Sequence, residues 1–229
     1  MKKVTSILLL LAGCGGGGGG GDTPSGGPTP SPNPASGAHV YYLNFDGQTL
    51  TAGPDDPVTN SSQLVFGTTT LPAYLAGDPQ RTTKIQAMVS EVTAILAPYD
   101  IAVVTARPAS GSYDMLVAGG ISPFGAGEPF AALSDCTGAR PNHVALMFDV
   151  STGHDAARRI IGSLGIGHGI SSSDAAADCM CFGPNCTVPL PAACTIGGAN
   201  TPISFVVKCD MANTMDVNQK FLSVFGAHP

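Results

Sequence analysis

The chain after residue 38 alternates between short apolar runs and one long helical stripe. The run from His39 ends in Asp46-Gly47, which predicts a strand closed by a turn. Downstream, apolar residues recur every three or four positions, which predicts an amphipathic helix that begins at Asp78-Pro79 and stops before Pro98. The residues of this stripe are Ile85, Met88, Val89, Val92, Ile95 and Leu96.

Further apolar runs predict additional elements in the same region. Short strands are expected at 101–105, 113–118 and 143–150, and a second helix from about Ser151 towards Leu164. Residues 51–80 carry four prolines and many Thr, Ser and Asp residues, so they are expected to be loop. A last helix could lie within 208–225. This order predicts an α/β (α+β) fold, in which helices pack on a mixed sheet.

The first residues have the pattern of an export signal. Lys2 and Lys3 precede a nine-residue apolar stretch, which is too short to cross a bilayer as a helix but suits a signal peptide. The stretch ends in Leu-Ala-Gly-Cys14, which resembles the bacterial lipobox. The resemblance implies cleavage before Cys14 and acylation of that cysteine. Gly15 in place of Asp is similar to lipoproteins sent to the outer membrane. The alternative is an ordinary secretory signal that happens to contain a cysteine.

Composition divides the chain into three parts. Residues 1–13 are the expected signal peptide, and residues 14–37 form a Gly/Pro-rich segment with almost nothing to bury, expected to be a flexible, lipidated tether. Residues 38–229 are expected to form one domain.

The net negative charge of the chain argues against nucleic acid as a partner. Only 11% of residues are charged and the formal net charge is −6, so no basic surface for nucleic acid is expected. Without a polybasic patch, attachment to a membrane would depend on the acyl chains. The 43% of apolar residues argues against a wholly disordered chain.

Several segments, in this order, resemble the secreted bacterial branch of the metzincins, which are zinc metallopeptidases with a mixed sheet and two long helices. They are YYLNFDG, LAPYDIAVVTARP, YDMLVAGG, NHVALMFDV and, last, ARRIIGSLGIGHGISSSDAAADCM, which ends at Met180. In the family the last place holds a helix with the motif HExxHxxGxxH, followed by a methionine turn. The motif supplies three histidine ligands to zinc, and its Glu is the general base.

This chain departs from that motif. In the preferred register, Gly165 matches the turn glycine and His168 the third ligand, with Met180 at the methionine turn. Arg158 then replaces the first histidine, and Gly162 replaces the second. Arg159 stands at the position of the general base, so no catalytic residue is assigned. An arginine cannot lose its proton to serve as a ligand or base.

A second register remains open. It makes His168 the second ligand and Asp174 a possible third, but loses the first histidine and the Glu. Other readings also remain: His154 and Asp155 could act as improvised ligands, or Arg158 and Arg159 could be ordinary solvated charges on a helix.

The cysteines point to an oxidising compartment. Apart from Cys14, six remain, enough for three disulfides in a loop-rich C-terminal part. Fifteen pairings are possible, and Cys179 and Cys181 are too close to pair with each other. A thiolate metal site in residues 179–186 is the alternative. The six candidates are Cys136, Cys179, Cys181, Cys186, Cys194 and Cys209.

These patterns give one leading hypothesis and two alternatives. The first is a bacterial lipoprotein, anchored in the outer membrane or at the cell surface, whose metallopeptidase-like domain has lost zinc and catalysis and has a binding or accessory role. No cofactor is then expected, and a protein or peptide is the possible ligand. The alternatives are an active zinc endopeptidase with unusual ligands around His168, and an unrelated surface binding domain.

Overall fold

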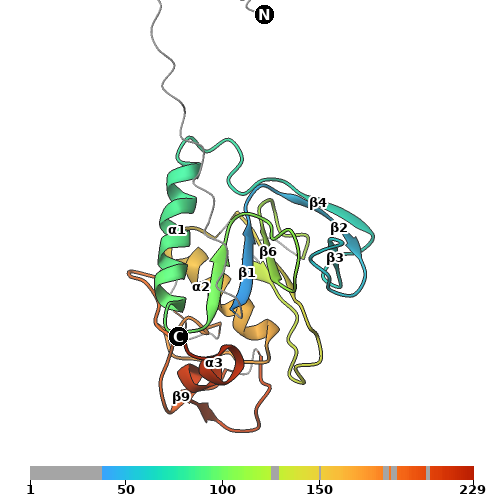
Figure 1. The fold of residues 1–229 in the computed structure, drawn as a ribbon. Coiled ribbons are helices and arrows are strands. Elements are labelled where there is room, and N and C mark those ends of the chain that lie inside the picture. Colours follow the sequence, from blue (N-terminus) through green and yellow to red (C-terminus); the bar gives the residue numbers. More distant parts are fainter. Residues whose placement is uncertain (1–37, 125–128, 150, 183–185, 187–189, 205–206) are drawn as a thin grey trace, which may run out of the picture. The chain divides into compact units, whose positions relative to one another are not determined.

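A five-stranded mixed sheet forms the centre of the domain (Figure 1). The computed structural model describes residues 38–124, 129–149, 151–182, 186, 190–204 and 207–229. The strands lie in the order β5-β1-β6-β8-β7; neighbours are parallel except β7, which runs antiparallel to β8 at the edge. Their bounds are β1 His39–Asn44, β5 Ile101–Val104, β6 Asp114–Ala118, β7 Phe130–Ala131 and β8 Val144–Met147.

Two long helices pack against each other on one face of this sheet. They are α1 (Arg81–Leu96) and α2 (Gly153–Gly167), and a shorter helix, α3 (Val217–Phe225), joins the same hydrophobic core. The stripe predicted for α1 is confirmed, because Met88, Val92 and Leu96 are buried and the other three stripe residues pack beside them. The mixed sheet with two main helices is therefore as expected.

A small second sheet covers the opposite face of the central one. It consists of β2 (Gln48–Ala52), β3 (Ser61–Ser62) and β4 (Thr68–Leu71), in the order β3-β2-β4. Successive side chains of the central strands point to opposite faces of the sheet. Leu116 therefore faces the helices, whereas Val117 belongs to the core shared with the small sheet. The expectation that 51–80 is loop was therefore wrong in part. These strands are short and expose most of their threonines, so they carry little hydrophobic signal.

The helix boundaries differ from the predicted ones in two places. α1 begins at Arg81 rather than at Asp78-Pro79, and the Asp78 carboxylate instead accepts hydrogen bonds from the Gln80 backbone and the Lys84 ammonium group. α2 continues to Gly167, beyond the predicted Leu164. No helix among the described residues is long and apolar enough to span a membrane.

Three disulfides hold the C-terminal part, as expected. They are Cys136–Cys209, Cys179–Cys194 and Cys181–Cys186. The alternative of a thiolate metal site in residues 179–186 was wrong, because all three cysteines of that segment are oxidised. In the described chain after Cys194, the strands are the short antiparallel pair β9 (Thr201–Pro202) and β10 (Thr214–Met215), and α3 follows them.

Candidate metal centre

Two histidines and an aspartate from distant parts of the chain meet at one edge of the central sheet. His39 opens β1, and Asp114 opens the neighbouring parallel strand β6, where it is in register with Tyr41. His168 is the C-terminal cap of α2. Parallel strands begin at the same edge of a sheet, so β1 and β6 bring the first two residues together, and the end of α2 adds the third.

The three side chains share a single carboxylate oxygen. The Oδ2 atom of Asp114 lies 2.7 Å from His39 Nε2 and 2.6 Å from His168 Nε2. One ligand atom from each residue lies within 4.8 Å of the others, and no other group of three or more such residues does so in the described part of the chain. Asp114 is buried, whereas the side chains of His39 and His168 keep 26% and 16% of their surface exposed.

Asp114 is held in place and kept ionised. Its second oxygen, Oδ1, accepts a hydrogen bond of 2.7 Å from the backbone N–H of His143, which leaves Oδ2 for the two imidazoles. Burial by itself would raise the pKa of Asp114, but hydrogen bonds from His168 and His39 outweigh that effect and hold the pKa well below its usual range. The cluster therefore contains a carboxylate rather than a carboxylic acid at neutral pH.

Aromatic rings enclose the cluster. The ring of Phe225, from α3, lies 5.1 Å from that of His39 and 4.9 Å from that of His168, centroid to centroid. The His143 ring lies 4.5 Å from His168 on another side. Burial lowers the pKa of His143 to about 4, against the opposing effect of Asp114, so this ring is neutral at pH 7. Its buried Nδ1 has no hydrogen-bond partner among the described residues.

The positions that the preferred register assigns to zinc do not converge on His168. α2 continues as a helix through Gly165, so the chain does not turn there. Arg158 precedes His168 by ten residues and Gly162 by six, which places them about 15 Å and 9 Å away along the helix axis. The ligands of one zinc ion must lie within a few ångströms of each other. These residues therefore do not fit the zinc site that the resemblance implies, and we derive no step through it.

The two arginines are not simple solvated charges. Arg158 is fully buried, and its Nη2 donates a hydrogen bond of 3.0 Å to Asp155. The guanidinium group of Arg159 lies 5.3 Å and 5.1 Å above the ring centres of Phe130 and Phe182. A side chain at Gly162 would overlap the Phe182 ring.

The remaining predicted residues lie elsewhere. Asp174, the ligand of the second register, is not among the clustered residues, and its backbone N–H donates to Pro202. His154 pairs with Glu91 at the other end of α2. Met180 is buried, and a Cβ at Gly165 would lie 2.5 Å from its sulfur. Cys14 lies outside the described residues.

Sequence reasoning therefore found one member of the cluster, His168, and missed His39 and Asp114. Each of the missed residues stands alone at the start of an apolar run, in no motif, and an isolated residue of this kind gives no signal of its partners. A polar residue at the first position of a buried strand could have drawn attention to both. No protein-family model matches the chain, and no curated protein does so either.

Proposed function

We propose that this chain is an exported, lipid-anchored bacterial domain of metallopeptidase-like architecture that binds a peptide or protein without hydrolysing it. The proposal rests on the residues of α2, the helix that the resemblance assigns to zinc binding and catalysis. Its positions do not converge on His168, since α2 is a continuous helix through Gly165. In addition, none of the three key positions, Arg158, Arg159 and Gly162, offers a metal ligand or a general base.

The architecture supports the resemblance in its coarse features. α1 and α2 lie side by side on a sheet that is parallel apart from its edge strand β7, and Met180 lies against α2 at Gly165. The α2 face itself is filled by protein. The Phe182 ring occupies the space beside Gly162, and the buried Arg158 donates a hydrogen bond to Asp155 through Nη2.

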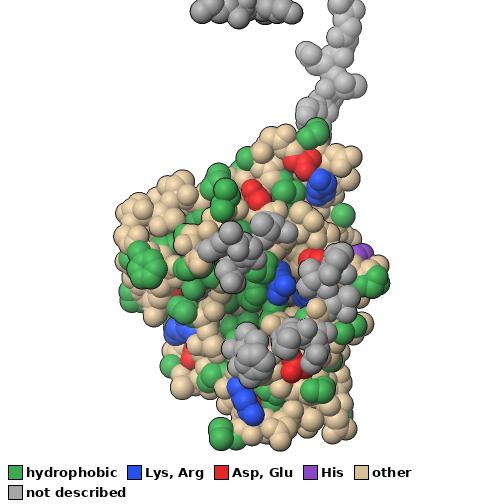
Figure 2. Space-filling view, turned by 180° about the vertical axis from the view of Figure 1, so that it is seen from behind, with side chains coloured by type: hydrophobic (Ala, Val, Ile, Leu, Met, Phe, Trp, Pro, Cys, Tyr) green, Lys and Arg blue, Asp and Glu red, His purple; other side chains and the backbone are tan. Residues whose placement is uncertain are grey.

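A pocket beside this helix supports a binding role. It lies between β7 and α2 and is lined by Phe130, Arg159 and Phe182 among other residues. In Figure 2, hydrophobic side chains lie beside Lys or Arg side chains near the middle of the face seen from behind. Among the strands that the structure describes, β7 pairs only with β8, so its other edge is available to pair with an extended peptide.

One observation favours the second candidate, an active zinc endopeptidase with unusual ligands. His168 does meet two further side chains of ligand type, His39 and Asp114. However, Asp114 is the cluster's carboxylate and both its oxygens are engaged, so it cannot also serve as a free general base.

The discriminating experiment is a casein assay with the full chain in detergent. We expect casein peptides to be retained by the immobilised protein and to remain intact, with or without added Zn²⁺. The Arg159→Ala variant should retain them several-fold less well, because the pocket loses its cation. His154→Ala, at the far end of α2, serves as the control and should behave as the parent.

Two outcomes would contradict the proposal. Casein cleavage that a chelator abolishes and that is lost in His168→Ala, but not in His154→Ala, would establish the peptidase alternative. Failure to retain any peptide, with no cleavage, would favour an unrelated surface domain.

A further inference from the structure

We infer that His39, Asp114 and His168 form a binding site for one divalent transition-metal ion of the Zn²⁺ type. This site differs from the helical motif discussed above, since only His168 belongs to both. It goes beyond the proposed function, which concerns the pocket and α2. It also departs from the expectation, based on the motif alone, that no cofactor binds.

The donor set determines which ions are suitable. Two imidazole nitrogens and one carboxylate oxygen are ligands that Zn²⁺ and its neighbours in the first transition row prefer, whereas Mg²⁺ and Ca²⁺ prefer oxygen atoms alone. Three protein ligands leave at least one coordination position for water. The partial exposure of His39 and His168 gives the ion and that water a path to the site.

Neighbouring groups hold the three ligands in orientation. The backbone N–H of His143 binds Asp114 Oδ1 and directs Oδ2 towards the histidines. The rings of Phe225 and His143 both pack edge-on against the His168 ring. Because α2 and the two strands are held by the main core, the three ligands are already gathered before an ion arrives.

Ion binding requires two small changes. In the hydrogen-bonded arrangement each Nε2 carries a hydrogen that it donates to Asp114. That hydrogen must move to Nδ1 or leave as a proton, since a metal binds the nitrogen lone pair. The Asp114 oxygen must also move away from each imidazole nitrogen by roughly 0.7 Å, from 2.6–2.7 Å to the spacing of about 3.3 Å that bonds of about 2.0–2.1 Å give around a tetrahedral zinc ion. Both changes need only side-chain rotation and proton exchange.

The ion would tie the start of the domain to its core. His39 is the first residue of β1, whereas Asp114 opens the central strand β6 and His168 caps the C-terminal end of α2. A metal bridge between them would hold β1 at the point where the tether is expected to leave the domain.

The test is a titration of the full chain in detergent, stripped with a chelator and dialysed, with Zn²⁺ followed by calorimetry. We expect one equivalent to bind, a higher Tm in its presence, and no competition from millimolar Mg²⁺. His39→Ala should weaken binding by at least about tenfold, because removing even an outer-shell partner typically costs that much. His168→Ala should do the same. His154→Ala, whose imidazole pairs with Glu91 instead, should leave both affinity and stoichiometry unchanged.

The inference is overturned if less than half an equivalent binds, or if His39→Ala binds Zn²⁺ as the parent does. In either case the three residues form a hydrogen-bonded cluster only. Since His39 is partly exposed, its replacement should preserve the fold, which the far-ultraviolet circular dichroism spectrum checks. This failure would leave the proposed function intact, because that rests on casein retention without cleavage. Conversely, casein cleavage by the zinc-loaded protein would overturn the proposed function and retain the metal site.

Discussion

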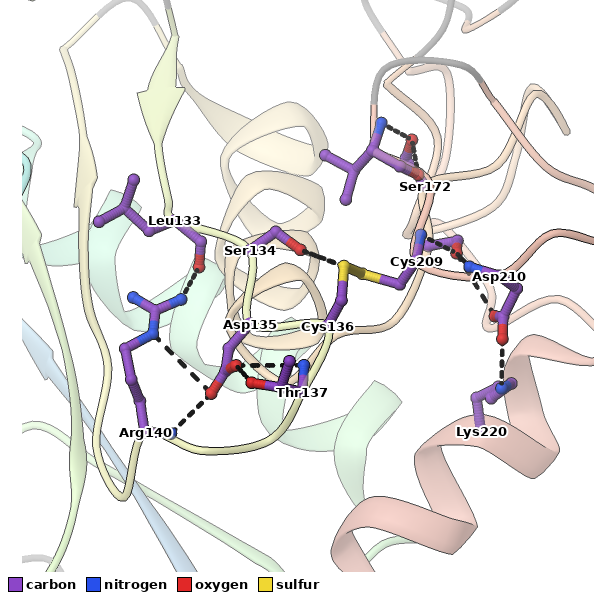
Figure 3. Close-up of a disulfide and its surroundings, with 12 residues drawn as sticks. Leu133, Ser134, Asp135, Cys136, Thr137, Arg140, Ser172, Cys209, Asp210 and Lys220 are labelled. Atoms are coloured by element: carbon purple, nitrogen blue, oxygen red, sulfur yellow. Dashed lines mark hydrogen bonds and ion pairs between the residues drawn. A yellow bond between two sulfur atoms is a disulfide. The ribbon is translucent and has the colours of Figure 1, made fainter.

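Asp135 shows at the scale of one residue how a loop of this domain is held. Its Oδ1 accepts hydrogen bonds from the backbone N–H and the hydroxyl of Thr137, and its Oδ2 accepts a bond of 2.7 Å from the Arg140 backbone (Figure 3). Burial opposes ionisation, but these hydrogen bonds prevail and hold the pKa of Asp135 below its usual range. The carboxylate thus organises the chain next to the Cys136–Cys209 bridge.

This arrangement predicts acid-dependent stability. Because the folded pKa of Asp135 lies below the unfolded value near 4, its contribution is present above about pH 4 and is lost as the pH falls further. Asp135→Asn should cost about 1–3 kcal/mol in the free energy of unfolding at pH 7, since an amide N–H would face the Arg140 N–H. The difference between parent and variant should shrink at pH 2–3 in urea titrations. Asp46→Asn, at a side chain that is 88% exposed, is the control and should change little. A difference that is the same at pH 7 and pH 2–3 would contradict the prediction.

The histidine cluster illustrates what residue-level reasoning can miss. His168 stood out because it matched half of a motif, whereas His39 and Asp114 matched nothing. Asp114 is separated from His39 by 75 positions and from His168 by 54. The order of the strands in the sheet decides which histidine meets which carboxylate. A short segment of sequence does not reveal that order.

At the scale of elements, a glycine of α2 allows neighbouring side chains to pack closely against the helix. Gly165 lies against Met180 and Phe221. A Cβ atom added to this glycine would lie 2.5 Å from the Met180 sulfur and 3.3 Å from the Phe221 ring. Both neighbours are fully buried. The glycine therefore serves close packing within a continuous helix, rather than the turn that the motif comparison assigned to it.

Gly165→Ala should consequently destabilise the domain in spite of alanine's helix propensity. We expect a net loss of about 1–2 kcal/mol, because overpacking costs up to about 3 kcal/mol and the propensity returns about 1 kcal/mol. The measurement is urea unfolding under oxidising conditions. Met180→Val in the same chain should restore part of the loss, in a double-mutant cycle with a favourable coupling energy. Additive effects would show that the two residues do not compete for space.

The disulfides differ in the length of chain that they enclose. Cys136–Cys209 closes a loop with a separation of 73 residues, whereas Cys181–Cys186 spans 5. The chain-entropy argument gives about 4 kcal/mol for the long loop and about 2 kcal/mol for the short one. Replacing both cysteines of a pair by serine should therefore cost more for Cys136 and Cys209 than for Cys181 and Cys186. Urea unfolding of the two double variants measures this, and the reverse order would show that the entropy of the unfolded chain is not the governing factor.

At the scale of the whole molecule, the proposal combines an anchor, a tether and a folded domain. The proposed anchor is Cys14, which the lipobox resemblance implies to be acylated. Stable attachment requires more than one acyl chain, and the acidic chain has no basic patch to contribute.

Cys14→Ala should therefore move the protein from the membrane fraction to the soluble one. In cells fed labelled palmitate, the parent should carry the label and partition into detergent, and the variant should do neither. Gly15→Asp is the matched control: it should keep the label but change the membrane in which the protein is found. A labelled Cys14→Ala variant, or an unlabelled parent, would favour the ordinary secretory signal.

The sequence by itself determined the features that depend on local periodicity and composition. The α1 stripe, the main strands and the presence of three disulfides follow from spacing and from the number of cysteines, because burial on one face of an element repeats along the chain. Only the tertiary structure decided the pairing of those cysteines, the small threonine-rich sheet, the burial of Arg158 and the meeting of His39, Asp114 and His168. Each of these depends on contacts between residues far apart in the chain. Such contacts form when strands and helices close on one another, and no single segment encodes them.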